Sequence, residues 1–188
     1  ASDGAILPEH DLTVIDEAHV VDDVISATTG VEIGAGRFTH LARLLRGILA
    51  EAGDTIAGVA DSGPVLSSAL VPHRDQRLTA PLPDALAGAL AAVRRRVEGA
   101  QVALRGIPEG VVDDVQARAI RARQAATALL EEIDAVSAPT DAHVLFVTGP
   151  EHAPALRLAP HDVADLLRER LPFPLLAQGE QPKQALVE

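Results

Sequence analysis

The sequence predicts a mixed α/β protein that is mostly helical, and three observations support this class. Short runs rich in apolar residues, at 12–15, 144–147 and 155–158, are typical of strands. Longer segments between them carry apolar residues at helical spacing. Hydrophobic residues make up 47% of the chain but aromatic residues only 2%, so the core must consist of aliphatic side chains and alanine, which favours closely packed helices. A length of 188 residues is enough for about one domain, or for one domain and a piece of another.

The first predicted elements are a strand, a short helix and a loop. The run 12–15 ends abruptly in polar residues, which is typical of a strand buried on both faces of a parallel sheet. Residues 20–28 carry valine and isoleucine at helical spacing, and Gly30 ends that pattern. The Gly34-x-Gly36 that follows lacks the third glycine and the preceding strand of a dinucleotide-binding turn, so we interpret it as a loop or hinge.

The middle of the chain predicts a block of helices. Residues 37–52 carry apolar side chains at positions i, i+3, i+4 and i+7, which predicts an amphipathic helix. Gly63-Pro64 interrupts the next pattern, so 53–83 is expected to form a broken helix and then a loop. Two long helices are predicted at 84–104 and 112–136, and their short connection indicates that they pack as an antiparallel pair.

The last part of the chain returns to strand-like patterns. The runs 144–147 and 155–158 are separated by a stretch rich in glycine and proline, which predicts a β-hairpin. A final helix is expected over 161–171, and the tail after Pro172 carries no clear pattern.

Composition excludes several classes of protein. Sixteen Lys and Arg against 27 Asp and Glu give a net charge of −11, the wrong sign for a free-standing protein that binds nucleic acid by neutralising many phosphates. Three Phe without Trp or Tyr exclude a platform of stacked aromatic side chains for single strands. Because there is no Cys, the chain holds no disulfide, thiolate metal site or iron-sulfur cluster of its own. No apolar run is long enough to span a bilayer and the start is acidic, so we expect a cytoplasmic protein without a membrane partner.

One constellation combines a motif with a structural context. Asp16-Glu17-Ala18-His19 directly follows the predicted strand 12–15, and the carboxyl end of a parallel strand is where such sheets bind ligands. There one carboxylate can bind the Mg²⁺ that bridges nucleotide phosphates, and its neighbour can orient or deprotonate an attacking water.

The segment PEHDLTVIDEAHVVDDVIS, residues 8–26, resembles the Walker B (DEAH) region of the superfamily 2 DNA helicases of the DinG/XPD type. The resemblance implies that the chain is part of an ATP-dependent enzyme that unwinds single-stranded or forked DNA, with ATP and Mg²⁺ as cofactors. It implies that Asp16 binds Mg²⁺, that Asp16 and Glu17 belong to the nucleotide site, that Glu17 is the catalytic carboxylate and that His19 couples hydrolysis to the second motor domain. An iron-sulfur cluster is possible in the parent protein, although this chain has no ligands for it.

The same resemblance implies a division of the chain. Residues 1–30 are expected to form the Walker B strand and following helix of a RecA-like motor domain, and 31–138 a helical, arch-like insertion that contains the long antiparallel pair. Residues 139–171 are expected to return to that motor domain as a hairpin and helix. The tail 172–188 resembles part of the second motor domain. The chain is therefore expected to be a fragment.

Departures from the family pattern limit the expected activity. No Gly-x-x-x-x-Gly-Lys-Ser/Thr loop occurs, and the only lysine is Lys183. The Ser-Ala-Thr at 26–28 lies too close to the DEAH box to be the family's later motif. The isolated chain is therefore not expected to hydrolyse ATP.

Other interpretations remain open. Arg94, Arg95, Arg118 and Arg121 could line a path for DNA, or they could be solvated arginines paired with nearby acids. The missing phosphate loop and the helical pair also fit a non-catalytic protein-interaction module. A third hypothesis is a metal-dependent hydrolase that uses Asp16, Glu17 and His19.

Overall fold

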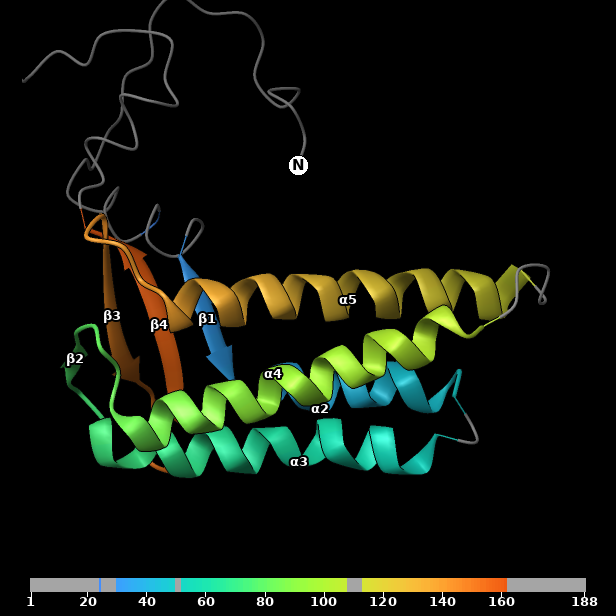
Figure 1. Cartoon of the computed structure of the whole chain (residues 1–188), viewed down its shortest axis with the longest axis horizontal. Coiled ribbons are helices and arrows are strands. Elements are labelled where there is room, and N and C mark those ends of the chain that lie inside the picture. The colour runs from blue at the N-terminus through green and yellow to red at the C-terminus, as the bar shows by residue number, and fades with distance from the viewer. Residues whose placement is uncertain (1–23, 25–29, 50–51, 108–112, 162–188) are drawn as a thin grey trace, which may run out of the picture.

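A computed structural model describes residue 24 and residues 30–49, 52–107 and 113–161 (Figure 1). The long helices are α2 (Ala35–Arg46), α3 (Gly53–Leu70), α4 (Asp84–Arg105) and α5 (Asp113–Ser137), and a 3₁₀ turn, η2, covers Val71–His73. The strands are β1 (Val31–Gly34), β2 (Arg77–Leu78), β3 (His143–Thr148) and β4 (Ala155–Pro160). The predicted strand at 12–15, most of the helices predicted at 20–28 and 161–171, and the tail lie outside the described residues.

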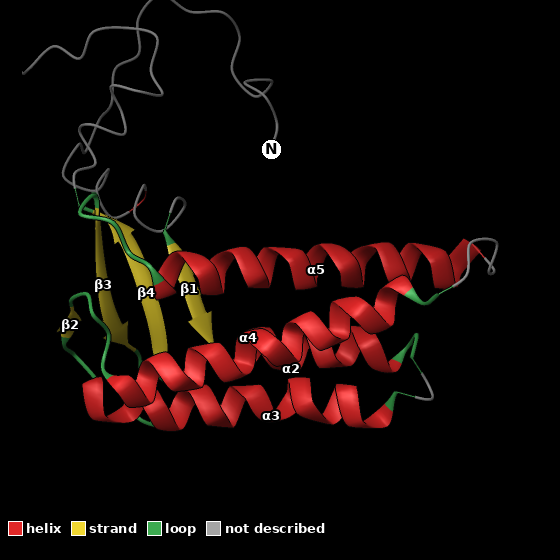
Figure 2. Cartoon of the chain, in the orientation of Figure 1, coloured by secondary structure: helices red, strands yellow, loops and turns green. Residues whose placement is uncertain are grey.

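The helices run side by side, and the sheet stands across one end of them (Figure 2). The described part is mostly helical, as predicted, and its sheet has four strands in the order β1-β4-β3-β2. All three strand pairings are antiparallel. The described strands therefore form no parallel motor sheet of the kind expected from residues 12–15.

The hairpin of β3 and β4 confirms the prediction for 144–147 and 155–158. The two strands pair from His143 with Pro160 to Thr148 with Ala155. Gly149 follows β3 with a φ of +89°, and a Cβ there would lie 2.6 Å from the carbonyl oxygen of Ala153. The turn therefore requires glycine at this position.

The prediction of a loop around Gly34 and Gly36 is wrong. Residues 31–34 form β1, with Ile33 fully buried and Glu32 exposed, and Gly36 lies in the first turn of α2. The strand pairs with β4, Val31 opposite Leu158, so the hydrogen bonds that stabilise it come from residues more than 120 positions later. The two-residue strand β2, which pairs with Leu145 and Phe146 of β3, was not predicted either.

The break predicted at Gly63-Pro64 is also wrong, because α3 continues through both residues. Pro64 has no backbone N–H to donate to the carbonyl one turn earlier in the helix. Because Pro64 lies on the exposed side of the helix, that carbonyl can accept a hydrogen bond from water instead. Buried residues on both sides of Pro64, among them Val59 and Leu66, stabilise the continuous helix.

The helices α4 and α5 form the predicted antiparallel pair (Figure 1). The helix predicted at 37–52 is α2, which begins at Ala35 and ends earlier, at Arg46, with Gly47 as its C-cap. One hydrophobic core joins the helices to the sheet: Phe38, Leu90 and Ile133 belong to the same buried cluster as Leu145 and Leu156. The hairpin therefore packs with the helical block rather than apart from it.

Candidate functional site

The residues predicted to serve ATP hydrolysis, Asp16, Glu17 and His19, lie outside the described residues. The candidate site that the structure describes consists of the arginines proposed to contact DNA and of their neighbours. These arginines lie on α4 and α5, and their partners decide which of them are available to a ligand.

Arg94 of α4 forms an ion pair that links the two long helices. Its Nε and Nη2 donate to the two carboxylate oxygens of Asp134 in α5, at 2.6 and 3.2 Å, and its Nη1 donates to Glu98. The hydrogen bond to Asp134 raises the pKa of Arg94, and the same bond lowers the pKa of Asp134. Arg94 is thus held between two carboxylates, as expected for an arginine paired with nearby acids.

The next two arginines of α4 point in different directions, as the helical geometry requires. Arg95 is exposed, and it has no acidic partner among the described residues. Arg96 is partly buried beside α3, where a Cβ at Gly58 would lie 4.0 Å from its side chain. Its Nη1 is buried without a hydrogen-bond partner in the described part of the chain. The triplet 94–96 therefore presents one free arginine rather than a continuous basic surface.

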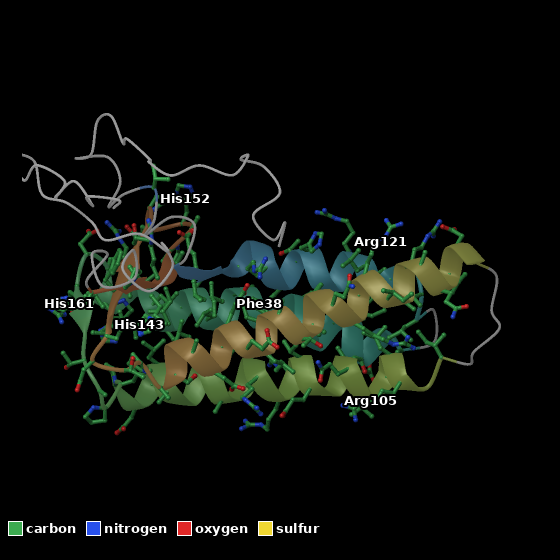
Figure 3. All side chains as sticks on the ribbon, turned by 90° about the horizontal axis from the view of Figure 1, so that it is seen from above. Phe38, Arg105, Arg121, His143, His152 and His161 are labelled. Atoms are coloured by element: carbon green, nitrogen blue, oxygen red, sulfur yellow. The ribbon has the colours of Figure 1, made fainter. Side chains whose placement is uncertain are left out.

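Arg118 and Arg121 lie one turn apart on α5, and both are exposed. The Nε of Arg118 donates to Asp114 at 3.2 Å, and its Nη1 lies 3.9 Å from the place that a Cβ would take on Gly47, just past the end of α2. Figure 3 shows Arg121 on the side of the body opposite Arg105 of α4. Within the described ranges, Arg121 has no ion-pair partner.

The arginines of α2 were not among the residues predicted from the sequence to contact DNA. Arg37 forms a bidentate ion pair with Glu132 of α5, in which Nε lies 3.1 Å from Oε2, whereas Arg43 is exposed and without an acidic partner among the described residues. The signal in the sequence is that the twelve residues of α2 contain three arginines and no Asp or Glu. This local excess of basic residues does not stand out in the composition, because the whole chain has a net charge of −11.

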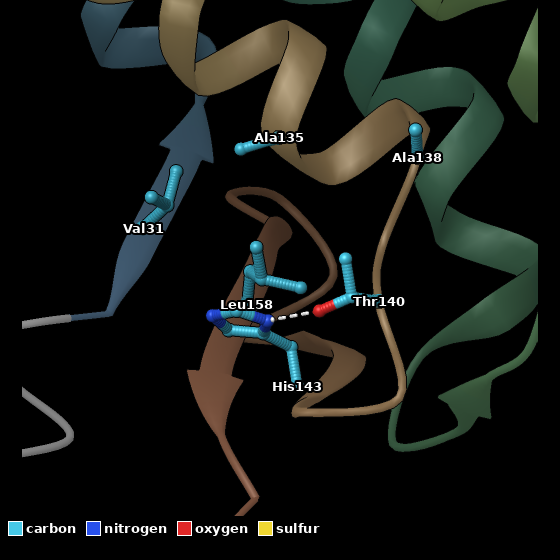
Figure 4. Close-up of a pocket in the computed structure, with 6 residues that line it drawn as sticks. All are labelled: Val31, Ala135, Ala138, Thr140, His143 and Leu158. Carbon is cyan, nitrogen blue, oxygen red and sulfur yellow. Dashed lines mark hydrogen bonds between the residues drawn. The ribbon is translucent and has the colours of Figure 1, made fainter. Parts of the chain in front are cut away.

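A pocket of about 200 Å³ lies at the other end of the body, between the end of α5 and the sheet (Figure 4). Most of its lining is apolar, and its two polar side chains, His143 and Thr140, bond to each other, with Nδ1 and Oγ1 2.9 Å apart. Among the described residues, no third side chain bonds to the imidazole of His143 and orients it, so the pair lacks the third group of an activated nucleophile.

Among the described residues, no group of three His, Asp or Glu side chains lies together in a way that could hold a metal ion. No helix in the described ranges combines the length and the apolar character that a membrane span requires. Comparisons with family models and with curated proteins found no match to the chain.

Proposed function

We propose that the chain is the DEAH-box and insertion portion of an ATP-dependent DNA helicase of the DinG/XPD type. The observation that carries this proposal is the segment 8–26, in which a strand-like run leads directly into Asp16-Glu17-Ala18-His19. In this proposal Asp16 binds the Mg²⁺ of Mg-ATP, and Glu17 orients and deprotonates the attacking water. His19 couples that step to the second motor domain.

The topology of the described body supports an insertion. Its first strand, β1, and its last, β4, are hydrogen-bonded neighbours, with Val31 opposite Leu158 and Gly34 opposite Ala155. The chain therefore enters and leaves the body at adjacent positions, as a domain inserted into another domain must do. Because β3 and β4 share the core of the helical block, the proposal assigns residues 31–160 to the insertion, including the hairpin that the resemblance assigned to the returning motor domain.

The phosphate-binding loop of this motor must come from outside the 188 residues, since none of them forms a Gly-x-x-x-x-Gly-Lys-Ser/Thr motif. The test therefore uses the complete gene product. There Glu17→Gln should lower DNA-stimulated ATP hydrolysis by about 100-fold or more, because the variant lacks the base, while binding of labelled ATP is retained.

Glu32→Gln is the matched control, because Glu32 is an exposed glutamate on β1 that the proposal gives no role. It should hydrolyse ATP at the rate of the unchanged protein. Full ATPase activity in the Glu17→Gln variant would contradict the proposal.

A second candidate function, a protein-interaction module, is favoured by two exposed apolar side chains on the helical pair. Val102 on α4 is 63% exposed and Ile120 on α5 is 46% exposed. Titrating the 188-residue chain with labelled ATP and with labelled single-stranded DNA separates the two candidates. Binding of either ligand would speak against a role limited to protein contacts.

The third hypothesis, a metal-dependent hydrolase, rests on Asp16, Glu17 and His19. It predicts a divalent ion bound without nucleotide. Metal analysis of the purified chain that finds none would remove this hypothesis.

A further inference from the structure

Charge is unevenly distributed between the described body and the rest of the chain. The whole chain has 16 basic and 27 acidic residues, but the described ranges contain thirteen arginines and thirteen acids. The excess of acid therefore lies outside the described body. The net charge of −11 does not describe the surface of the helical block, and it does not exclude a basic site there.

Within the body, six of the thirteen arginines lie on α2 and α5, two helices that contact each other. α2 has no acidic residue, and α5 has none between Asp114 and Glu131. The ion pair of Arg37 with Glu132 near one end of the contact, and the approach of Arg118 to Gly47 at the other, show that α2 and α5 run antiparallel. The acid-free stretches of the two helices consequently lie side by side.

Four side chains of these stretches form what we call the α2–α5 basic surface: His40 and Arg43 on α2, and Arg118 and Arg121 on α5, all exposed. The two residues on each helix are three positions apart, so they lie on the same side of their helix. Arg118 is held by Asp114, while Arg43 and Arg121 have no acidic partner among the described residues. Ile120 points away from Arg121, because consecutive residues of a helix face in different directions.

We propose that the α2–α5 basic surface binds the phosphodiester backbone of a nucleic-acid strand. Guanidinium groups pair with phosphate oxygens through two hydrogen bonds, and exposed arginines without intramolecular partners are free to do so. The four residues include no Phe, Tyr or Trp. Contacts from arginine to phosphate oxygens carry no sequence information, so the contact is expected to be independent of nucleotide sequence. An acidic protein is a poorer fit, because the arginines that anchor protein interfaces lie in well-packed, desolvated pockets, whereas these four side chains lie on an exposed surface.

The proposal does not depend on ATP hydrolysis, because neither Asp16 nor Glu17 takes part in it. The test measures fluorescence anisotropy of a labelled oligothymidine with the 188-residue chain at about 50 mM salt, and repeats the titration at higher salt. The test variant is Arg43→Ala with Arg121→Ala, which breaks no ion pair of the described residues. It should bind about tenfold more weakly, and the slope of log affinity against log salt should fall by about 1.4, since each phosphate contact to a single strand contributes about 0.7.

The matched control is Arg77→Ala with Arg105→Ala, which removes the same charge from two other exposed arginines. Arg105 lies on the opposite side of the body (Figure 3), so the control should bind within about twofold of the unchanged chain. A labelled duplex in place of the oligothymidine shows whether the strand is bound single or paired.

The proposal is overturned if the test and control variants lose equal affinity, or if neither loses any. It is also overturned if the chain binds polyglutamate but neither form of DNA, which would indicate an acidic protein partner instead. Circular dichroism of both variants should match that of the unchanged chain, because all four substituted side chains are exposed.

Discussion

Gly63 lies where α3 passes close to the first residue of α2. A Cβ at this position would lie 3.1 Å from the Cβ of Ala35 and 3.2 Å from its Cα and its carbonyl oxygen. Two of these atoms belong to the backbone at the junction of β1 and α2, so they cannot move aside by a change of rotamer. The glycine therefore sets the distance between the two helices.

Gly63→Ala should destabilise the protein, although alanine is the better helix former by up to about 1 kcal/mol. The added methyl group must displace the backbone of Ala35, and overpacking of this kind costs about 1–3 kcal/mol. The free energy of unfolding, measured by urea denaturation, should therefore fall.

Gly88→Ala is the control for this prediction. Gly88 is also inside a helix, α4, but it is exposed and its Cβ would have no atom within 4 Å. This substitution should stabilise the protein by about 0.5–1 kcal/mol through helix propensity alone. An equal gain in both variants would show that α3 and α2 are not in close contact at Gly63.

The ion pair of Arg94 with Asp134 links α4 to α5 across forty positions of sequence. Since the bond to Arg94 lowers the pKa of Asp134 in the folded protein, the carboxylate contributes stability only while it is ionised. This contribution to stability is complete above the usual aspartate pKa of about 3.9. It is lost as the pH falls through the lower pKa that Asp134 has in the folded protein.

Asp134→Asn should therefore lower the melting temperature at pH 7 by a few degrees at most, because the pair is exposed to solvent. The difference from the unchanged protein should shrink below about pH 3.9 and disappear once the carboxyl group is protonated. Glu131→Gln, on the same helix but without a partner in the described ranges, should melt like the unchanged protein at both pH values. A difference for Asp134→Asn that persists at acid pH would indicate a role other than this ion pair.

The elements that the sequence predicted are those with a strong local pattern. The periodic apolar stripes of α4 and α5 and the hairpin of β3 and β4 needed no distant information. By contrast, β1 has four residues and β2 has two, and each depends on pairing with a strand far along the chain. In α3 the burial of Val59 and Leu66 outweighed the local effect of Pro64.

The candidate site was predictable only in part, for a similar reason. Arg118 and Arg121 could be selected because they cluster in the sequence, but the partner of Arg94 lies on another helix and could not be identified from spacing. The arginines of α2 become candidates only because α2 packs against α5 and brings them beside the arginines of α5. No local pattern in the sequence predicts this packing. The roles assigned to Asp16, Glu17 and His19 remain predictions, because these residues lie outside the described ranges.

In the described part of the chain, the helices and the sheet share one hydrophobic core. Phe38 of α2 is fully buried, as are Val93 of α4 and Leu156 of β4 in the same cluster. If these elements form one cooperative unit, damage to the core on the helical side must weaken the sheet as well. If the hairpin instead belonged to a separate motor domain, its stability would not respond to α2.

Phe38→Ala distinguishes these two cases. Removing a buried phenylalanine side chain costs about 3–5 kcal/mol, and in a single cooperative unit this loss appears in every element. Hydrogen exchange of the amides of α4 and of β3 that exchange through global unfolding should therefore accelerate by the same factor in the variant. The amides of the buried residues Val93 and Val147 are suitable probes. Acceleration in α4 with unchanged exchange in β3 would show that the sheet folds apart from the helices, and would move the end of the proposed insertion back to the end of α5.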